Sequence, residues 1–239
     1  MVIQFKVHGS GKDLYGDGMA IWYARDRMVD GPIFGSADYF HGLAVIIDTY
    51  SNHNGEHNHQ HPYISAMVNN GTLHYDHDRD GTHTQLAGCE VKLRNLYYDT
   101  NILIRYERET LTVMTDLDNK ADWKDCLSVS GVHLPTGYYF GVSAATGDLS
   151  DAHDIMSIRL LELDTPDATV EDRSNIVPSA ERFEAPRESF VYSNRVSSDS
   201  GYGAIAEEPH YVPVHVDENY VHVPYLNNTS LADNKLFQL

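Results

Sequence analysis

The sequence predicts an all-β protein that folds as an antiparallel sandwich, and three observations support this prediction. Short segments that alternate apolar and polar residues, or that stay apolar throughout, recur between residues 2 and 163. Stretches rich in Gly, Asn and Asp, which favour turns, separate these segments. Helical periodicity is nearly absent, and strands that follow one another without intervening helices favour an antiparallel sandwich over a parallel α/β sheet.

The expected strands follow in chain order. Residues 2–7 alternate between two faces, whereas residues 43–50 and 63–68 are largely apolar and therefore suit buried strands. Four residues, Glu107-Arg108-Glu109-Thr110, separate two further strands and have the length of a hairpin connection. These two strands are expected at residues 100–106 and 111–116, and the last two at 137–145 and 154–163.

The composition changes after the last expected strand. Six prolines lie between Pro166 and Pro224, and apolar runs long enough to build a core are few. Residues 211–214 and 220–224 have the composition of edge strands, but a proline interrupts each of them. We therefore expect one sandwich domain at residues 1–164 and an irregular or disordered tail at residues 165–239.

The charge balance narrows the classes of partner. The 239 residues include 35 Asp and Glu against 17 Lys and Arg, which gives a formal net charge of −18. Such a surface repels nucleic acids and anionic lipids and concentrates divalent cations. No segment approaches the roughly 18 consecutive apolar residues of a membrane span, and no signal peptide is visible. The composition thus argues against nucleic-acid binding and against a membrane span in this chain.

Two polar segments beside apolar runs supply oxygen ligands for a hard cation. Asp48-Thr49-Tyr50-Ser51-Asn52 follows one expected strand, and Asp76-His77-Asp78-Arg79-Asp80-Gly81 lies further along the chain. Calcium binds six to eight oxygens from carboxylates, Asn side chains, backbone carbonyls and water. Asp48, the Tyr50 carbonyl, Asn52 and Asp80 form a suitable ligand set, although spacing alone does not show that they converge.

Other interpretations of these segments remain open. The second segment begins like an EF-hand loop, but the twelfth position holds Ala87 instead of glutamate, and the flanks lack helical spacing. Gly16-Asp17-Gly18 by itself suits a hairpin turn. Four histidines, His53, His57, His59 and His61, crowd the next loop, where they either bind a transition metal or are simply solvated.

Two modifications are possible on the residues alone. Cys89 and Cys126 are either free thiols or one disulfide, depending on the compartment. Two triplets, at Asn70 and Asn228, have the sequence of glycosylation acceptors, and we favour Asn70.

Many ordered blocks of the sequence resemble one known family. They begin with Gly-Asp-Gly-Met-Ala-Ile-Trp-Tyr at residues 16–23 and continue with Phe-Gly-Ser at 34–36, His-Gly-Leu-Ala at 41–44, and blocks at 48–52, 62–65, 68–71, 73–77, 86–89, 111–117, 134–141 and 146–151. These blocks resemble the animal L-type lectins of the early secretory pathway, in particular the vesicular integral membrane lectins. The resemblance covers residues 3–163.

The resemblance implies a concanavalin-like jelly-roll sandwich that binds calcium and the mannose residues of high-mannose N-glycans. It implies a sorting lectin for glycoprotein cargo, on the lumenal side between the endoplasmic reticulum and the Golgi apparatus, and no catalysis. The family's calcium ligands fall on Asp48, the Tyr50 carbonyl, Asn52 and Asp80. Its sugar contacts fall on Asp17, which follows a cis peptide bond in the family, and on Asn52, His77, Gly147, Asp148 and Leu149. The blocks around Cys89 favour a disulfide with Cys126.

Relative to this family, the sequence lacks the signal peptide, the first strands of the sandwich and the C-terminal membrane helix. One alternative is therefore an N-terminally truncated chain with little binding activity. Another is a glycoside hydrolase of jelly-roll fold, which would need paired carboxylates such as Asp17, Asp80 and Asp148. Bound calcium argues against such an enzyme. The ion stabilises the ionised form of nearby carboxylates, whereas a general acid has to be protonated.

Overall fold

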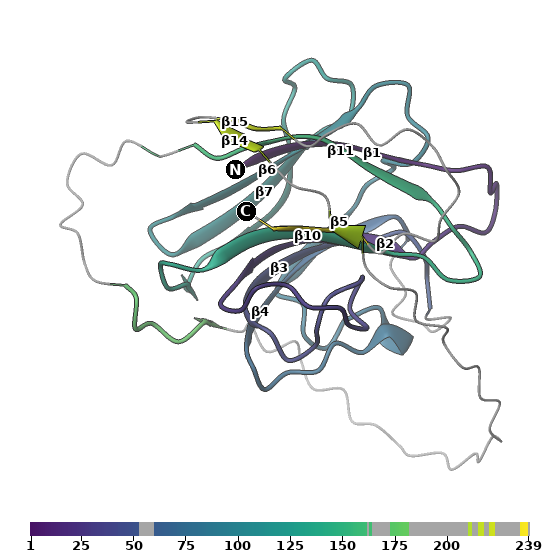
Figure 1. Ribbon diagram of the computed structural model, residues 1–239. Coiled ribbons are helices and arrows are strands. Elements are labelled where there is room, and N and C mark those ends of the chain that lie inside the picture. Colours follow the sequence, from purple (N-terminus) through teal and green to yellow (C-terminus); the bar gives the residue numbers. More distant parts are fainter. Residues whose placement is uncertain are drawn as a thin grey trace, which may run out of the picture.

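A computed structural model of the chain describes residues 1–52, 60–161, 163 and 173–181, together with four strands of backbone at 210–211, 215–217, 220–222 and 235–238. Two sheets face each other as the layers of a sandwich (Figure 1). The only helix in these residues is one turn of 3-10 helix, η1 (His77–Arg79). Nearly all strand pairs are antiparallel, which confirms the predicted fold class.

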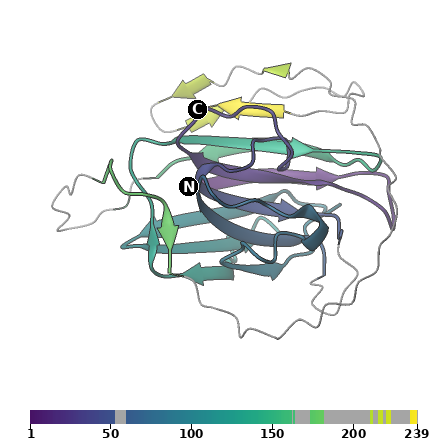
Figure 2. The same cartoon turned by 90° about the horizontal axis from the view of Figure 1, so that it is seen from below.

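The strands divide between two large sheets and one small one. The first sheet has the order β14 (His215–Asp217), β15 (Tyr220–His222), β11 (Ala152–Arg159), β1 (Val2–His8), β6 (Thr100–Glu107), β7 (Thr110–Asp116) and β8 (Lys124–Val129). The second sheet has the order β13 (His210–Tyr211), β16 (Lys235–Gln238), β10 (Tyr139–Ala145), β2 (Gly18–Ala24), β3 (His41–Asp48), β4 (Tyr63–Asn70) and β5 (Ala87–Glu90). The small sheet pairs β9 (Val132–His133) with β12 (Ser179–Ala180), which lies at the margin of the sandwich in Figure 2.

All seven expected strands are present, with ends shifted by a few residues, and β13 and β15 overlap the two segments with edge-strand composition. Strands β2, β5, β8, β9, β12, β14 and β16 were not predicted. Strand β2 is buried along almost its whole length, because the second sheet has a core on each face. Such a strand has no apolar-polar alternation, so periodicity does not reveal it.

The main core lies between the two sheets, and a second core covers the outer face of the second sheet. The second core is built on Trp22, Ala44, Ile46 and Met67, and it includes Met28, Ile33, Phe34, Phe40 and Tyr75 from the connecting loops. Aromatic contacts fix these loops, with ring centroids 5.0 Å apart for Trp22–Phe40 and 5.8 Å apart for Phe34–Tyr75. The loops after β2 and β4 are therefore packed onto the sheet.

A disulfide joins the margins of the two sheets. Cys89 in β5 and Cys126 in β8 are bonded, with an S–S distance of 1.98 Å, so the pairing favoured by the resemblance is present. The two cysteines are 37 residues apart, and closing a loop of this length typically stabilises a fold by about 3 to 4 kcal/mol. The bond connects the edge strand of one sheet with the edge strand of the other.

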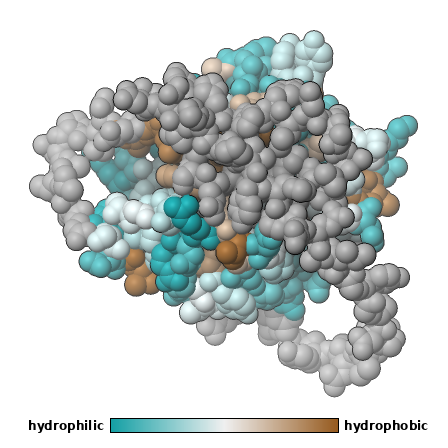
Figure 3. All heavy atoms as spheres, in the orientation of Figure 1, coloured by the Kyte–Doolittle hydropathy of each residue, from teal (hydrophilic) through white to brown (hydrophobic). Residues whose placement is uncertain are grey.

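Several residues beyond position 164 also contact the sandwich. Ser179–Ala180 pairs with β9, and Arg173 donates a hydrogen bond to the Tyr106 hydroxyl at 3.2 Å. The strands β13 to β16 join the outer edges of both large sheets. No helix among the described residues is long and apolar enough to cross a membrane. On the face drawn in Figure 3, the coloured residues are mostly hydrophilic, with a few apolar patches among them.

One histidine in the first sheet couples folding to pH. Nε2 of His153 in β11 is buried, and burial lowers the pKa of His153 from 6.5 to about 4, although Asp151 and Asp154 favour the protonated form. The unfolded chain therefore takes up a proton below pH 6.5 that the folded chain accepts only near pH 4.

We expect this difference to destabilise the protein as the pH falls from 6.5 to 4, by on the order of 2 to 3 kcal/mol. The stability from this residue is fully present above pH 6.5. The check is the free energy of unfolding in urea, measured from pH 4 to pH 7.5 for the wild type and for His153→Leu. The variant should show a flatter pH dependence, and equal slopes would contradict the assignment.

Candidate functional site

Three adjacent strands of the second sheet end at one place. The strand register pairs Gly18 of β2 with Asp48 of β3 and with Ala145 of β10. Asp17, directly before β2, therefore lies beside the ends of both neighbouring strands. A cavity of about 240 Å³ opens here, lined by Asp17, Pro32, Phe34, Asp48, Asn52, His77 and Ala145.

A larger cavity of about 510 Å³ lies elsewhere, between the two sheets, with a mostly apolar lining that includes Ile21, Leu43 and Ile104. Its lining also includes polar side chains such as Arg105, Glu107 and Arg173, but no group of potential metal ligands lies beside it among the described residues, as one does beside the smaller cavity. The smaller cavity is therefore the better candidate for recognition of a polar ligand.

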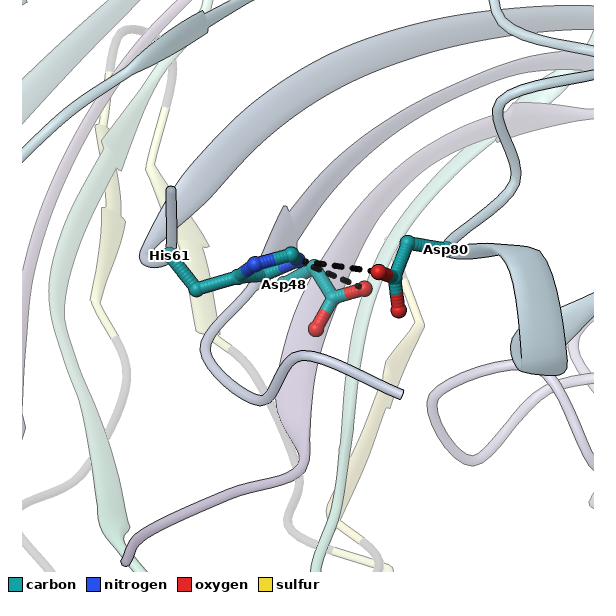
Figure 4. A group of neighbouring side chains, drawn as sticks. All are labelled: Asp48, His61 and Asp80. Carbon is teal, nitrogen blue, oxygen red and sulfur yellow. Dashed lines mark ion pairs between the residues drawn. The ribbon is translucent and has the colours of Figure 1, made fainter. Parts of the chain in front are cut away.

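Asp48, His61 and Asp80 form a buried cluster beside the smaller cavity (Figure 4). His61 Nε2 lies 3.7 Å from Asp48 Oδ2 and 3.9 Å from Asp80 Oδ2. The side chains of the three residues are only 5%, 7% and 1% exposed, in the order His61, Asp48 and Asp80. One potential ligand atom from each residue lies within 4.8 Å of the other two, which is close enough for a shared cation.

Local backbone geometry holds both carboxylates in place. Asp48 Oδ1 accepts a hydrogen bond from the Tyr50 amide at 3.1 Å, and Asp80 Oδ1 accepts one from the Asn52 amide at 2.8 Å. Asp80 caps η1 in the left-handed conformation, with φ of 49°. Residues 48–52 and Asp80, which the sequence analysis singled out in separate segments, are thus tied together.

The electrostatics of the cluster favour a bound cation. Burial raises the pKa of the Asp48 carboxyl, the nearby His61 opposes this shift, and the charge of Asp80 adds to it. Two buried carboxylates repel each other, and a divalent ion between them would remove that cost. The donor set of carboxylates, the neighbouring Asn52 side chain and the Tyr50 carbonyl has the chemistry of a calcium site.

Asp17 is hydrogen-bonded both to residues 48–52, which follow β3, and to the end of β10. The Gly16–Asp17 peptide bond is cis, as the resemblance implied. The Asp17 amide donates to the Ala145 carbonyl at 3.1 Å, and the Thr49 amide donates to the Asp17 carbonyl at 3.0 Å. Burial raises the pKa of the Asp17 carboxyl, and the charge of His77 partly offsets the increase.

The remaining residues expected to contact sugar differ in how close they come. His77 Nε2 lies 2.8 Å from the Pro32 carbonyl, and its ring contacts those of Phe34 and Tyr75 at centroid distances of 5.3 and 4.8 Å. A Cβ atom at Gly147 would lie 3.5 Å from Asp17 Oδ2, so Gly147 is next to that carboxylate. Asp148 and Leu149 belong to the same loop but do not line the cavity.

His61 lies in the histidine-rich loop of the sequence and was not predicted to join Asp48 and Asp80. The register of β3 and β4 pairs Asp48 with Tyr63, which brings His61 back beside Asp48. Treating residues 43–50 and 63–68 as a hairpin would have indicated this proximity. His53, His57 and His59 lie outside the described residues.

A buried ion pair supports the chain that leads into Asp17. Arg94 Nε and Nη2 each lie 2.7 Å from an oxygen of Asp151, and these side chains are 8% and 0% exposed. Arg94 also donates to the Gly11 carbonyl at 2.8 Å and stacks on the Tyr15 ring at 4.0 Å. The Asp151 amide donates to the Gly16 carbonyl at 3.1 Å, so the pair supports the chain segment that directly precedes Asp17.

We expect Arg94→Met to lower the free energy of unfolding by about 3 to 5 kcal/mol, because it leaves the buried Asp151 carboxylate without its partner. The measurement is urea unfolding at pH 7. The double variant Arg94→Met with Asp151→Leu should recover part of the loss, since no charge then remains unpaired. A loss below about 1 kcal/mol in the single variant, the range of a surface pair, would contradict this role.

Comparisons with known proteins agree with this architecture. Human vesicular integral-membrane protein VIP36 is 54% identical over 192 residues, which are 79% of this chain and 54% of that protein. Human VIP36-like protein is 52% identical over 188 residues, 77% of this chain and 54% of that protein. Human protein ERGIC-53 is 39% identical over 167 residues, 69% of this chain and 32% of that protein. The chain thus spans about half the length of the VIP36 relatives that it matches.

Among solved structures, the exoplasmic/lumenal domain of VIP36 in its Ca²⁺/Man-bound form matches with a TM-score of 0.73 and 54% identity, covering 77% of this chain and 75% of that one. The carbohydrate recognition domain of Emp47p matches with a TM-score of 0.51, 64% of this chain and 67% of that one, and at 19% identity it shows the fold alone. The profile of the legume-like lectin family matches residues 1–170. The chain belongs to the legume-like lectin family.

Proposed function

We propose that this chain binds high-mannose N-glycans of glycoproteins in a calcium-dependent manner, as a cargo-sorting lectin on the lumenal side of the early secretory pathway. The observation that carries the proposal is the cavity lined by Asp17, Asn52 and His77, which shares Asp48 with the buried cation cluster. The similarity to VIP36, whose lumenal domain has been solved with Ca²⁺ and mannose, supports it.

The calcium ligands in this proposal are Asp48, the Tyr50 carbonyl, Asn52 and Asp80. The two carboxylates are already close together, and Asn52 is fixed to Asp80 by its backbone amide at 2.8 Å. Water would complete the six to eight oxygens that calcium binds. Calcium on the Asn52 side-chain oxygen would orient the amide nitrogen toward the sugar, so metal removal weakens binding without removing a sugar contact.

The sugar contacts in this proposal are Asp17, Asn52, His77 and the loop of Gly147, Asp148 and Leu149. Asp17 supplies a fixed acceptor for mannose hydroxyls, and Asn52 supplies an amide donor. The Gly147 amide already donates to the Leu149 carbonyl at 3.0 Å, so the amides of Asp148 and Leu149 are the donors left to face a ligand. His77 is held against Phe34 and Tyr75 and would bond a hydroxyl through its ring.

We expect Asp17→Asn to weaken binding of a high-mannose oligosaccharide roughly 10- to 100-fold, because it replaces a charged acceptor of the hydroxyls. Calcium affinity should stay close to that of the wild type, since Asp17 is not a calcium ligand. Asp80→Asn should weaken both calcium binding and sugar binding, and a chelator should abolish sugar binding by the wild type. Isothermal titration calorimetry with calcium and with the oligosaccharide measures each affinity.

The matched control is Asp13→Asn, the same change at an exposed carboxylate outside the cavity. It should bind calcium and sugar like the wild type. Absence of sugar binding by the wild type at saturating calcium would contradict the proposal. Release of reducing sugar from the oligosaccharide would favour the glycoside hydrolase instead.

We also propose that Asn70 carries an N-linked glycan. Asn70 is exposed at the end of β4, and its Oδ1 accepts hydrogen bonds from Thr72 Oγ1 at 2.6 Å and from the Thr72 amide at 3.2 Å. The Thr72 hydroxyl and the Asn70 side-chain amide of the acceptor triplet are thus in contact. An exposed triplet of this sequence suits a chain that enters the secretory pathway.

Expression in a secretory host should give a chain whose electrophoretic mobility increases on treatment with an N-glycosidase. Asn70→Gln and Thr72→Ala should each abolish this increase, while Asn228→Gln should leave it unchanged. Mass spectrometry of the peptide that contains residues 69–72 identifies the modified residue directly. An unmodified peptide from the secreted wild type would contradict the assignment.

A further inference from the structure

His61 gives the cation cluster a nitrogen ligand that calcium does not need. Its imidazole Nε2 faces the Oδ2 atoms of both Asp48 and Asp80, as Figure 4 shows, at 3.7 and 3.9 Å. Calcium selects oxygen ligands, whereas imidazole suits zinc and the neighbouring transition metals. The cluster therefore combines the two carboxylates proposed above for calcium with a ligand of a different preference.

The position of His61 is set by the fold. Pro62 is buried, Tyr63 begins β4 opposite Asp48, and the His61 ring lies 6.4 Å from the Tyr63 ring. The His61 side chain is only 5% exposed, so it lies inside the protein with both carboxylates. Burying an imidazole costs free energy unless its nitrogens meet charged or polar groups. Here Nε2 faces two carboxylates, which are groups that bind metal ions.

The distances suit one small ion. Zinc binds imidazole nitrogen at about 2.0 to 2.1 Å and carboxylate oxygen at about 2.0 to 2.2 Å, which places neighbouring ligands of a tetrahedral site roughly 3.4 Å apart. The two nitrogen-oxygen distances here exceed that value by only a few tenths of an ångström. Small rotations of the two carboxylates would bring both oxygens to the separation that a zinc site needs.

A tyrosine hydroxyl is buried beside the cluster. Tyr75 is only 2% exposed, and its buried hydroxyl interacts with the Asp48 carboxylate. A hydroxyl next to the carboxylates would bond a metal-bound water, which a three-residue site with an open position provides.

We propose that Asp48, His61 and Asp80 form a site for a divalent transition-metal ion of the zinc class, and that this ion competes with calcium for the two carboxylates. The proposal rests on the calcium site proposed above, because Asp48 and Asp80 belong to both ligand sets. Each ion draws the carboxylates to a different side, zinc toward His61 and calcium toward Asn52. Occupation by zinc therefore excludes calcium and, with it, the orientation of Asn52 for sugar.

The test is zinc binding by the full chain after treatment with a chelator, compared with His61→Phe. Calorimetry should show that the variant loses zinc affinity roughly 100-fold or more, because one of three protein ligands is gone. Its calcium affinity should change less than about threefold, since calcium uses oxygen ligands. X-ray absorption of the zinc-loaded wild type should show an imidazole nitrogen at about 2.0 to 2.1 Å that the variant lacks.

Two more variants separate this site from other histidines and from misfolding. A variant with His53, His57 and His59 changed to Ala should keep the wild-type zinc affinity. His61→Gln, which retains a polar side chain, should lose zinc affinity like His61→Phe. Circular dichroism of each variant establishes that it folds before its affinity is compared.

Zinc affinity that follows the three loop histidines instead of His61 would overturn the proposal. So would zinc binding that leaves the calcium titration unchanged, because the two ions must then occupy separate sites. Failure of the proposed lectin function has a different result, namely a wild type that binds no sugar at saturating calcium. Dependence of zinc binding on His61 can be observed in either case.

Discussion

The burial of two carboxylates at the end of β3 is the constraint on which the site depends. Asp48 and Asp80 are close together and nearly inaccessible to water, so their charges have to be neutralised within the protein. The backbone amides of residues 50 and 52 supply part of this neutralisation, and the His61 imidazole faces the other oxygen of each carboxylate. Within the proposed function, a cation completes the neutralisation and fixes Asn52 at the edge of the cavity.

Asp17 lies between two supports of different chemistry. On one side, the Thr49 amide links it to the segment that carries the proposed calcium ligands. On the other, the Asp151 amide and the Arg94–Asp151 ion pair hold the segment that leads into Asp17, from Gly11 to Gly16. Metal and ion pair thus act on the same residue through separate contacts, so a change in one support need not disturb the other.

Part of this site could be predicted from the sequence, and the rest depends on contacts between distant segments. The carboxylates and the amide of residues 48–52 and Asp80 stand out because their ligand chemistry is visible in two short segments, and the structure brings these segments together. The assignment of individual ligands and sugar contacts remains a prediction. His61 was missed because its role follows from the pairing of β3 with β4. Arg94 and Asp151, 57 residues apart, have no local signal of their partnership.

The same contrast applies to the fold. Strands with one buried face, such as β1 and β7, show the alternation from which they were predicted. Strand β2 is buried on both faces and follows Gly16-Asp17-Gly18, a triplet that by itself suits a turn, so neither its start nor its periodicity was informative.

The second core, which covers the outer face of the second sheet, has a consequence for the affinity of the cavity. Phe34 and Tyr75 are fully buried in that core, and they contact His77 at the cavity wall. The wall is therefore rigid before any ligand arrives, and binding does not have to freeze a loose loop, which would cost conformational entropy. Within the proposed function, this preformed wall favours the affinity of the cavity for a single sugar residue.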